Sequence, residues 1–253
     1  MTVALFVALL PQLTGTPPCV RSTLCPISWK VVEARTNGLP TNPSHAPSVT
    51  ITLLPGRSAI PPALEAEFAQ THLLIRAVDL ADGEATRKAM AAAAMRFGGI
   101  DVLVNVAGGF RYETLLEGGI ATWDEMFAMN LRTAVVSCKA ALPALLESGR
   151  GRIINIGAGA AAKGRTGMGA YTASKAGVQR LTESLADELK DRGVTVNAIL
   201  PGTIDTPRNR ADMPNADFSR WVSPAAIAEV ILFLASDAAS AVTGASIPVT
   251  GRG

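Results

Sequence analysis

The sequence predicts an α/β fold in which a parallel sheet is covered on both faces by helices. Apolar runs of strand length alternate with longer stretches of helical periodicity from about residue 71 onward. The run Ile100–Val106 is almost continuously apolar, as expected for a strand buried on both faces. Hydrophobic residues make up 48% of the 253 residues, which is enough to fill the core of one domain.

Charge and cysteine content exclude several classes of protein. The net charge is only +2 and no long Lys/Arg run occurs, so no nucleic-acid partner is expected. No apolar stretch reaches the ~18–20 residues that span a bilayer, so no membrane is expected. Cys19, Cys25 and Cys138 form no disulfide framework, which makes the cytoplasm the expected compartment. These cysteines and the two histidines lack metal-ligand spacing, so no metal is expected.

Residues 1–70 differ in composition from residues 71–253. Ten of the sixteen prolines lie between Pro11 and Pro62. Proline removes backbone donors and clashes with the preceding helical turn, so this Pro-rich segment is atypical for an α/β domain. Its candidate strands are Trp29–Val32 and Val49–Leu54, and the apolar run Thr2–Leu10 fits a short buried strand better than a signal peptide, since no Lys or Arg precedes it.

The first half of the remaining chain alternates cleanly between strands and helices. Thr71–Val78 is expected to be a strand, and Asp82 to cap a helix that ends at Gly98. The inward face of that helix should carry Met90, Ala93, Ala94 and Phe97. After the strand Ile100–Val106, the pattern Thr122-x-x-Glu125 predicts a capping box at the start of a long helix.

The second half continues the same alternation. A helix is expected over Ala170–Arg192, closed by Gly193, and a last helix should begin at Ser223-Pro224. The expected strands are Arg152–Ile156, Val194–Leu200 and Ser246–Val249.

Tyr171 and Lys175 are the first candidates for catalysis. Residues four apart share one face of a helix, so the two side chains should be neighbours. A tyrosine has a pKa near ~10 and is a poor acid-base group at neutral pH, but a nearby ammonium favours the phenolate and should lower that pKa. The alternative is a solvated lysine one turn from a half-buried tyrosine.

Three further segments are candidates for ligand contacts. The small residues of Asn105–Gly109 follow a buried strand, where they either let backbone approach a ligand or form a plain turn. Asn130 lies inside a predicted helix, where asparagine marks either a local kink or a surface position. Pro201–Thr206 ends a strand, and either holds a ligand or simply turns.

In this order and spacing, these residues resemble the short-chain dehydrogenase/reductase family over about residues 71–253. NVAG at 105–108 is similar to the family's NNAG, with Val106 in place of the second asparagine. Tyr171 and Lys175 match its catalytic pair, and Asn130 matches its helix asparagine. The resemblance implies a doubly wound, Rossmann-like parallel sheet.

The resemblance also implies a function. Tyr171 would donate the proton in a hydride transfer, Lys175 would lower its pKa and hold the nicotinamide ribose, and Asn130 would order a proton-relay water. The cofactor would be NADH or NADPH, the substrate a small molecule, and the protein a homo-oligomer (dimer or tetramer) paired through helices 122–147 and 170–192. The positions matching the family's cofactor contacts are Asp79, Leu80, Asn105, Ala107, Gly108, Tyr171, Lys175, Pro201, Gly202, Ile204 and Thr206.

Two departures from the family pattern stand out. The family's catalytic serine is replaced by Ala158, which has no hydroxyl to bond a substrate oxygen. The family's T-G-x-x-x-G-x-G turn is missing, because Thr14-Gly15 is followed by two prolines. The first βαβ unit is therefore in doubt. Residues 1–70 are either a degraded cofactor half or a frameshift product, and the coding DNA would decide between them.

Three functions remain open at this point. Ala158 and the segment 204–221 resemble the dihydropteridine reductase branch, which would make the substrate a quinonoid dihydropterin. A carbonyl reductase that tolerates the alanine is a second function. A catalytically impaired relative that acts as a binding or assembly partner is a third.

Overall fold

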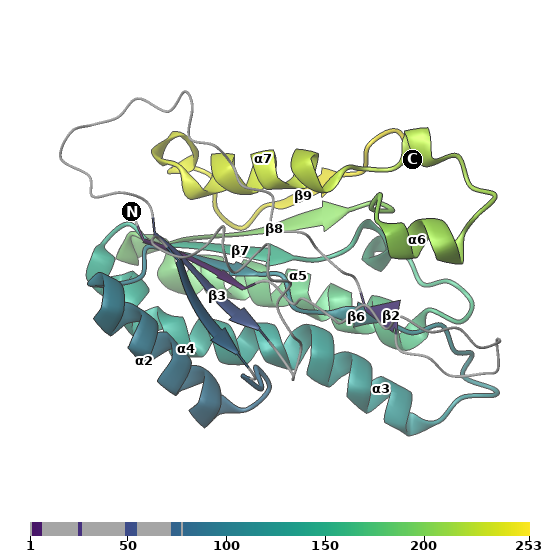
Figure 1. The fold of residues 1–253 in the computed structure, drawn as a ribbon, viewed down its shortest axis with the longest axis horizontal. Helices are drawn as coiled ribbons and strands as arrows, with labels where there is room; N and C mark the ends of the chain where they lie inside the picture. Colours follow the sequence, from purple (N-terminus) through teal and green to yellow (C-terminus); the bar gives the residue numbers. More distant parts are fainter. Residues whose placement is uncertain (1, 7–24, 27–48, 55–71, 77) are drawn as a thin grey trace.

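The computed structural model describes residues 2–6, 25–26, 49–54, 72–76 and 78–253. Its main sheet has seven strands in the order β4-β3-β1-β5-β7-β8-β9, and every neighbouring pair is parallel (Figure 1). The strands are β1 Thr2–Phe6, β3 Val49–Leu54, β4 His72–Arg76, β5 Val102–Asn105, β7 Arg152–Ile156, β8 Thr195–Pro201 and β9 Ser246–Val249. From β1 the chain runs outward to β4 and then returns to continue from β5. This reversal confirms the predicted doubly wound, Rossmann-like fold.

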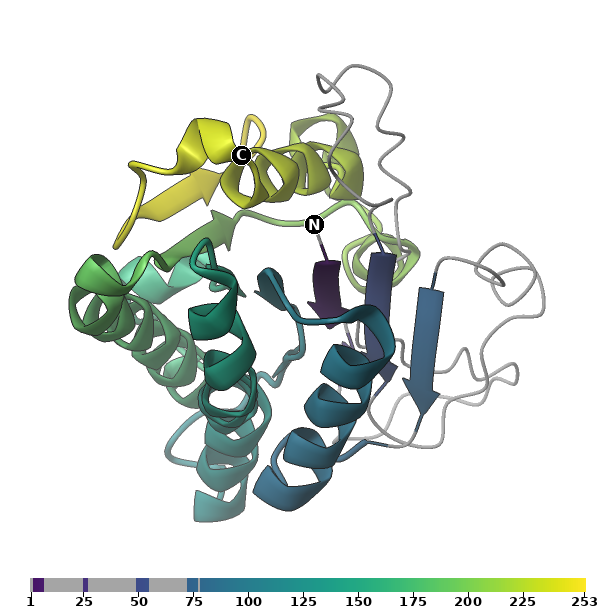
Figure 2. The same ribbon diagram turned by 90° about the vertical axis from the view of Figure 1, so that its left-hand side faces the viewer.

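Helices cover both faces of this sheet. Figure 2 shows α2, α4 and α5 packed on one face and α7 on the other. The helices are α2 Gly83–Phe97, α3 Ile120–Met126, α4 Thr133–Ser148, α5 Gly169–Leu189, α6 Pro207–Asp212 and α7 Pro224–Ala235. No helix within these described ranges is long and apolar enough to cross a bilayer.

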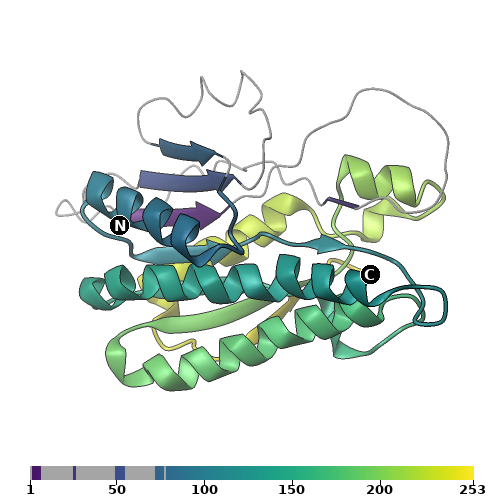
Figure 3. The ribbon, with the colours of Figure 1, turned by 90° about the horizontal axis from the view of Figure 1, so that it is seen from below.

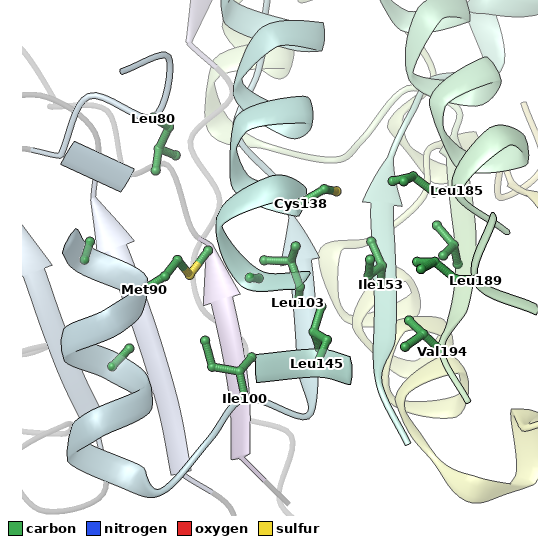
Figure 4. Packing of buried hydrophobic residues seen from close by; sticks show 14 of the residues in the cluster. Leu80, Met90, Ile100, Leu103, Cys138, Leu145, Ile153, Leu185, Leu189 and Val194 are labelled. Atoms are coloured by element: carbon green, nitrogen blue, oxygen red, sulfur yellow. The ribbon is translucent and has the colours of Figure 1, made fainter. Parts of the chain in front are cut away.

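The core is divided by the sheet into two apolar layers. Leu103 and Ile153 point to the layer under α2, α4 and α5, together with Met90 and Leu185 (Figure 4). The alternate strand residues, such as Val104, belong to the layer under α7. A central strand must therefore be apolar at every position, which is why its sequence reads as a continuous run.

The N-terminal strands belong to the same sheet as the rest of the chain. β1 lies between β3 and β5 and aligns Val3 with both Thr50 and Val102. The expected strands at the start of the chain and at Val49–Leu54 are therefore present. Trp29–Val32 and the Thr14-Gly15 turn lie outside the described residues, so the structure does not test the frameshift alternative. A two-residue strand, β2 Cys25–Pro26, pairs antiparallel with β6 Gly109–Phe110.

The predicted capping box is wrong. α3 begins at Ile120 and Gly119 occupies its cap position, so Thr122 lies inside the first turn and is buried. Glu125 does not reach back to the backbone, because its carboxylate pairs with Arg111 at 2.8 Å. The other predicted caps are confirmed, with Asp82 accepting from two backbone amides of α2 and Ser223 accepting from α7.

Candidate active site

Tyr171 and Lys175 lie in the first two turns of α5, at the carboxyl ends of the strands. Both side chains are buried, with 9% of Tyr171 and 4% of Lys175 exposed. The Lys175 ammonium donates a hydrogen bond of 2.8 Å to the carbonyl of Ile156, the last residue of β7. The helix therefore holds its cation directly over the end of a central strand.

Burial shifts the pKa values of the pair in opposite directions. It raises the pKa of Tyr171 to about 12 and lowers the pKa of Lys175 to about 8, because each charged form loses its hydration. The sequence-based expectation that Lys175 lowers the Tyr171 pKa is not met here, since desolvation alone accounts for the shift. Tyr171 is therefore protonated at neutral pH and can act as a proton donor.

Gly108 lies between Asn130 and Lys175. A Cβ at this position would stand 2.6 Å from the Asn130 Oδ1 and 3.0 Å from the Lys175 Nζ. The backbone of the NVAG segment thus packs closely against two candidate site residues, and only glycine fits at 108 without displacing one of them.

We expect Gly108→Ala to destabilise the protein by about 1–3 kcal/mol, since neither neighbour can move freely in a packed site. Urea unfolding measures the change. Gly83→Ala is the matched control, because a Cβ there meets nothing within 4 Å. This control should be neutral or stabilising by roughly 0.4–1 kcal/mol. Equal effects at the two positions would contradict the crowding seen at Gly108.

Asn130 lies in a π-helix, Phe127–Arg132, that joins α3 to α4. Its Oδ1 accepts from the Gly109 amide at 2.9 Å, and its Nδ2 donates to the Gly109 carbonyl at 3.1 Å and to the Ser174 hydroxyl at 3.0 Å. Ser174 in turn donates to the Tyr171 carbonyl at 2.8 Å. The asparagine therefore lies in a local distortion of the helix, which was one of the two alternatives, and its hydrogen bonds link β6 to α5. Such π-bulges are frequent at functional sites.

Ser174 was not among the predicted site residues. The signal for it in the sequence is its position three residues after Tyr171, which puts it beside the tyrosine on the helix surface. Asn105, which was among them, turns its side chain into the core. Its amide donates to the Asn155 Oδ1 at 2.8 Å and to the Cys138 sulfur at 3.2 Å. Ala107 packs against the core layer under α4.

The remaining predicted cofactor residues lie along the same edge of the sheet. After β8, the amide of Gly202 donates to Val249, the carbonyl of Ile204 accepts from Asn209 at 2.7 Å, and the Thr206 hydroxyl caps α6. Pro201 is the last residue of β8 and is buried. After β4, the Asp79 carboxylate is exposed and accepts from the Ala81 amide at 2.9 Å, whereas Leu80 is buried in the core and offers only its backbone.

An apolar cluster surrounds Tyr171. Its buried members include Met126, Ala158 and Ala170, and the Phe110 ring meets the Tyr171 ring edge-on at 4.9 Å between centroids. Ala158 thus stands beside the tyrosine and contributes no hydroxyl.

These groups fit the nicotinamide end of a dinucleotide. Gly108 offers backbone without a side chain and follows β5, which flanks the point where the strand order reverses. Lys175 is a buried cation at the end of the neighbouring strand β7. The switch point is the usual ligand site of open parallel sheets. The segment that follows β1, where the pyrophosphate turn would lie, is outside the described residues.

Comparison with known proteins decides the family. A family model described as enoyl-(acyl carrier protein) reductase matches residues 49–251. The chain belongs to the short-chain dehydrogenase/reductase family. It is therefore an oxidoreductase of this family, whose members use NADH or NADPH, and the predicted cofactor class is confirmed.

Several relatives within the family are similar over most of their length. A 2,5-dichloro-2,5-cyclohexadiene-1,4-diol dehydrogenase of Sphingobium indicum is 37% identical, over 71% of this chain and 74% of its own. A 3-oxoacyl-[acyl-carrier-protein] reductase of Vibrio cholerae is 34% identical, over 69% and 75%. The carveol dehydrogenase of Mycobacterium avium, solved in complex with NAD, superposes with a TM-score of 0.71 at 27% identity, over 81% of this chain and 87% of its own. None of these three relatives supports the dihydropteridine reductase branch.

Proposed function

We propose that the protein reduces the carbonyl group of a small molecule with NADH or NADPH, using Tyr171 as the proton donor. The observation that carries this proposal is the burial of a protonated tyrosine and a lysine one turn apart at the carboxyl end of the sheet. The names of the relatives support it, since they include a 3-oxoacyl reductase and an acetoacetyl-CoA reductase.

The residues of this site can carry out each step of the reaction that requires a group of the protein. A bound NADH or NADPH would supply a hydride for the carbonyl carbon, and Lys175 would hold its nicotinamide ribose. The C=O electron pair then moves to the oxygen, which takes the proton of the Tyr171 hydroxyl and leaves a phenolate. Asn130 keeps the Gly108–Gly109 backbone in place beside Lys175.

An assay with purified protein tests the proposal. Loss of nicotinamide absorbance is followed with NADH and NADPH against simple ketones, a 3-oxoacyl thioester and a quinonoid dihydropterin. Turnover of a ketone or thioester supports the proposal. Turnover of the dihydropterin alone would favour the pterin substrate, and no turnover of any compound would favour a non-catalytic partner.

We expect Ala158→Ser to raise kcat/KM on a simple ketone by about tenfold. A hydroxyl beside Tyr171 adds a donor to the developing oxyanion, and one such donor in an adapted site is worth roughly 10²–10³-fold. The gain should be smaller here because the neighbouring side chains have packed around a methyl group. The measurement compares parent and variant on one ketone, with Ala160→Ser, a less buried position of the same cluster, as the control. A loss of activity in Ala158→Ser would show that the site needs the smaller side chain.

We also propose that the protein is a homo-oligomer, a dimer or tetramer, paired through α4 and α5. A hollow on the outer side of the α3–α4 helix is lined by Phe127, Leu131, Val135 and Val136, and both Phe127 and Val135 are exposed in the single chain. Sedimentation velocity of the parent and of Phe127→Ser tests this, with a shift to the monomer expected for the variant.

A further inference from the structure

Four large apolar side chains are exposed within nine residues, three in the segment that joins β6 to α3 and one at the first residue of α3. Tyr112, Leu115, Leu116 and Ile120 are 62%, 75%, 95% and 72% exposed. Single exposed apolar residues are common on protein surfaces, but a group of this size in one short segment marks a binding surface. We call these four residues the apolar lip.

The backbone of the apolar lip is fixed by hydrogen bonds on both sides. The Glu113 amide donates to the Gly167 carbonyl at 2.8 Å, and the Gly118 amide closes a turn onto the Thr114 carbonyl at 2.9 Å. The Arg111 guanidinium, just before the lip, pairs with Glu125 of α3. The exposed side chains are therefore presented by an ordered turn.

The apolar lip borders the candidate active site. The Tyr112 ring stands over Gly167, where an added Cβ would lie 2.3 Å from it, and Gly167 precedes Tyr171 by one turn's length of chain. Ile120 lies one turn before Trp123 on α3, and Trp123 packs in the apolar cluster around Tyr171. Figure 3 shows the segment between β6 and α3 at the same end of the molecule as α6.

We propose that the apolar lip binds an aliphatic or alicyclic part of the substrate that extends beyond the reacting carbonyl group. Tyr112 over Gly167 and Ile120 one turn before Trp123 place two members of the lip next to the apolar cluster around Tyr171, which makes the substrate its occupant. The cluster receives the carbonyl end, where Ala158 leaves an apolar wall, and the lip receives the rest. The proposal rests on the proposed reductase function and defines its substrate as an apolar carbonyl compound.

The test is a series of methyl ketones from 2-butanone to 2-decanone, reduced by the full-length protein with NADH or NADPH. The parent should show a kcat/KM that rises at least roughly tenfold along the series, because each added methylene gains buried contact. The double variant Leu115→Ser/Leu116→Ser should lose that rise and keep its activity on 2-butanone within about twofold. Met95→Ser is the matched control, since Met95 is equally exposed but lies on α2. Retention of the chain-length preference by the double variant would overturn the proposal.

Two further measurements separate this inference from the reductase function itself. Calorimetric titration of 2-decanone in the presence of NAD⁺ or NADP⁺ reports binding without turnover. If no ketone is reduced but the binding of 2-decanone depends on Leu115 and Leu116, the proposed reductase function is contradicted and the proposed role of the apolar lip is supported. If the binding of 2-decanone does not depend on Leu115 and Leu116, the proposed role of the apolar lip is contradicted. Sedimentation velocity of the double variant tests whether a second copy of the chain, instead of substrate, occupies the apolar lip. A change in oligomeric state would show that it does and would contradict the proposal.

Discussion

Replacing Tyr171 with phenylalanine should lower kcat by about 10²–10⁴-fold, the range typical of a lost general acid. The hydroxyl is the proton source in the proposed reaction, and its raised pKa keeps it protonated across the neutral range. The phenylalanine ring preserves the edge-on contact with Phe110, so the apolar cluster should stay packed. Steady-state kinetics on a ketone found active with the parent measures the change.

Two controls make the Tyr171→Phe result specific to proton transfer. Dissociation constants for NADH and NADPH should change by less than about threefold, and the thermal midpoint should be nearly the same as the parent's, because only one atom is removed. A kcat within a factor of about three of the parent would remove the tyrosine from the mechanism.

The stability of the protein without cofactor should rise by about 3 kcal/mol between pH 8 and pH 10.5 through Lys175 alone. The pKa of Lys175 falls from 10.5 in the unfolded chain to about 8 in the fold. Between these values the unfolded chain binds the extra proton, so a higher pH favours the folded state. Tyr171 acts in the next window, since its pKa rises from 10.0 to about 12 and the folded state binds the extra proton there. Stability should therefore fall again above about pH 10.5, where the lysine contribution is complete and the tyrosine contribution is still being lost.

Urea unfolding at a series of pH values, for the parent and Lys175→Met, isolates the lysine. The unfolding free energy of the parent minus that of Lys175→Met should increase between pH 8 and pH 10.5, because methionine fills the same space without a charge. Lys88→Met is the control on the exposed face of α2, and its unfolding free energy should change with pH as that of the parent does. A pH-independent difference between the parent and Lys175→Met would mean that the amine stays charged in the fold.

The strands and long helices could be predicted because their signals are local. The strand Arg152–Ile156 was predicted to the residue, and Gly193 closes the α5 segment as expected, in the left-handed conformation that glycine favours. The start of α3 was misplaced because Thr122-x-x-Glu125 also fits a buried threonine and an ion-paired glutamate. That choice depends on Arg111, which meets Glu125 only in the folded chain.

The candidate site was predictable in its residue types and less so in its contacts. Spacing predicted that Tyr171 and Lys175 are neighbours, whereas the approach of Gly108 to Asn130 and Lys175 is seen only in the fold. The Tyr171 pKa shift was expected in the wrong direction, because the sequence shows a neighbouring cation but not the depth of burial that outweighs it. The inward turn of the Asn105 side chain depends on Asn155, a residue of another strand, and no local pattern reports such a pairing.

The position of β1 has a consequence for how the chain is made. β1 precedes both of its partner strands in the chain, with Val3 aligned to Val102 of β5 on one side. One edge of this strand therefore has no partner until β5 has been synthesised, and closing so long a loop is slow. During that interval an apolar strand with an open edge is exposed to chaperones or to misassociation with other chains. Recovery of native protein should accordingly depend more on the rate of synthesis and on chaperone supply than on the final stability of the fold.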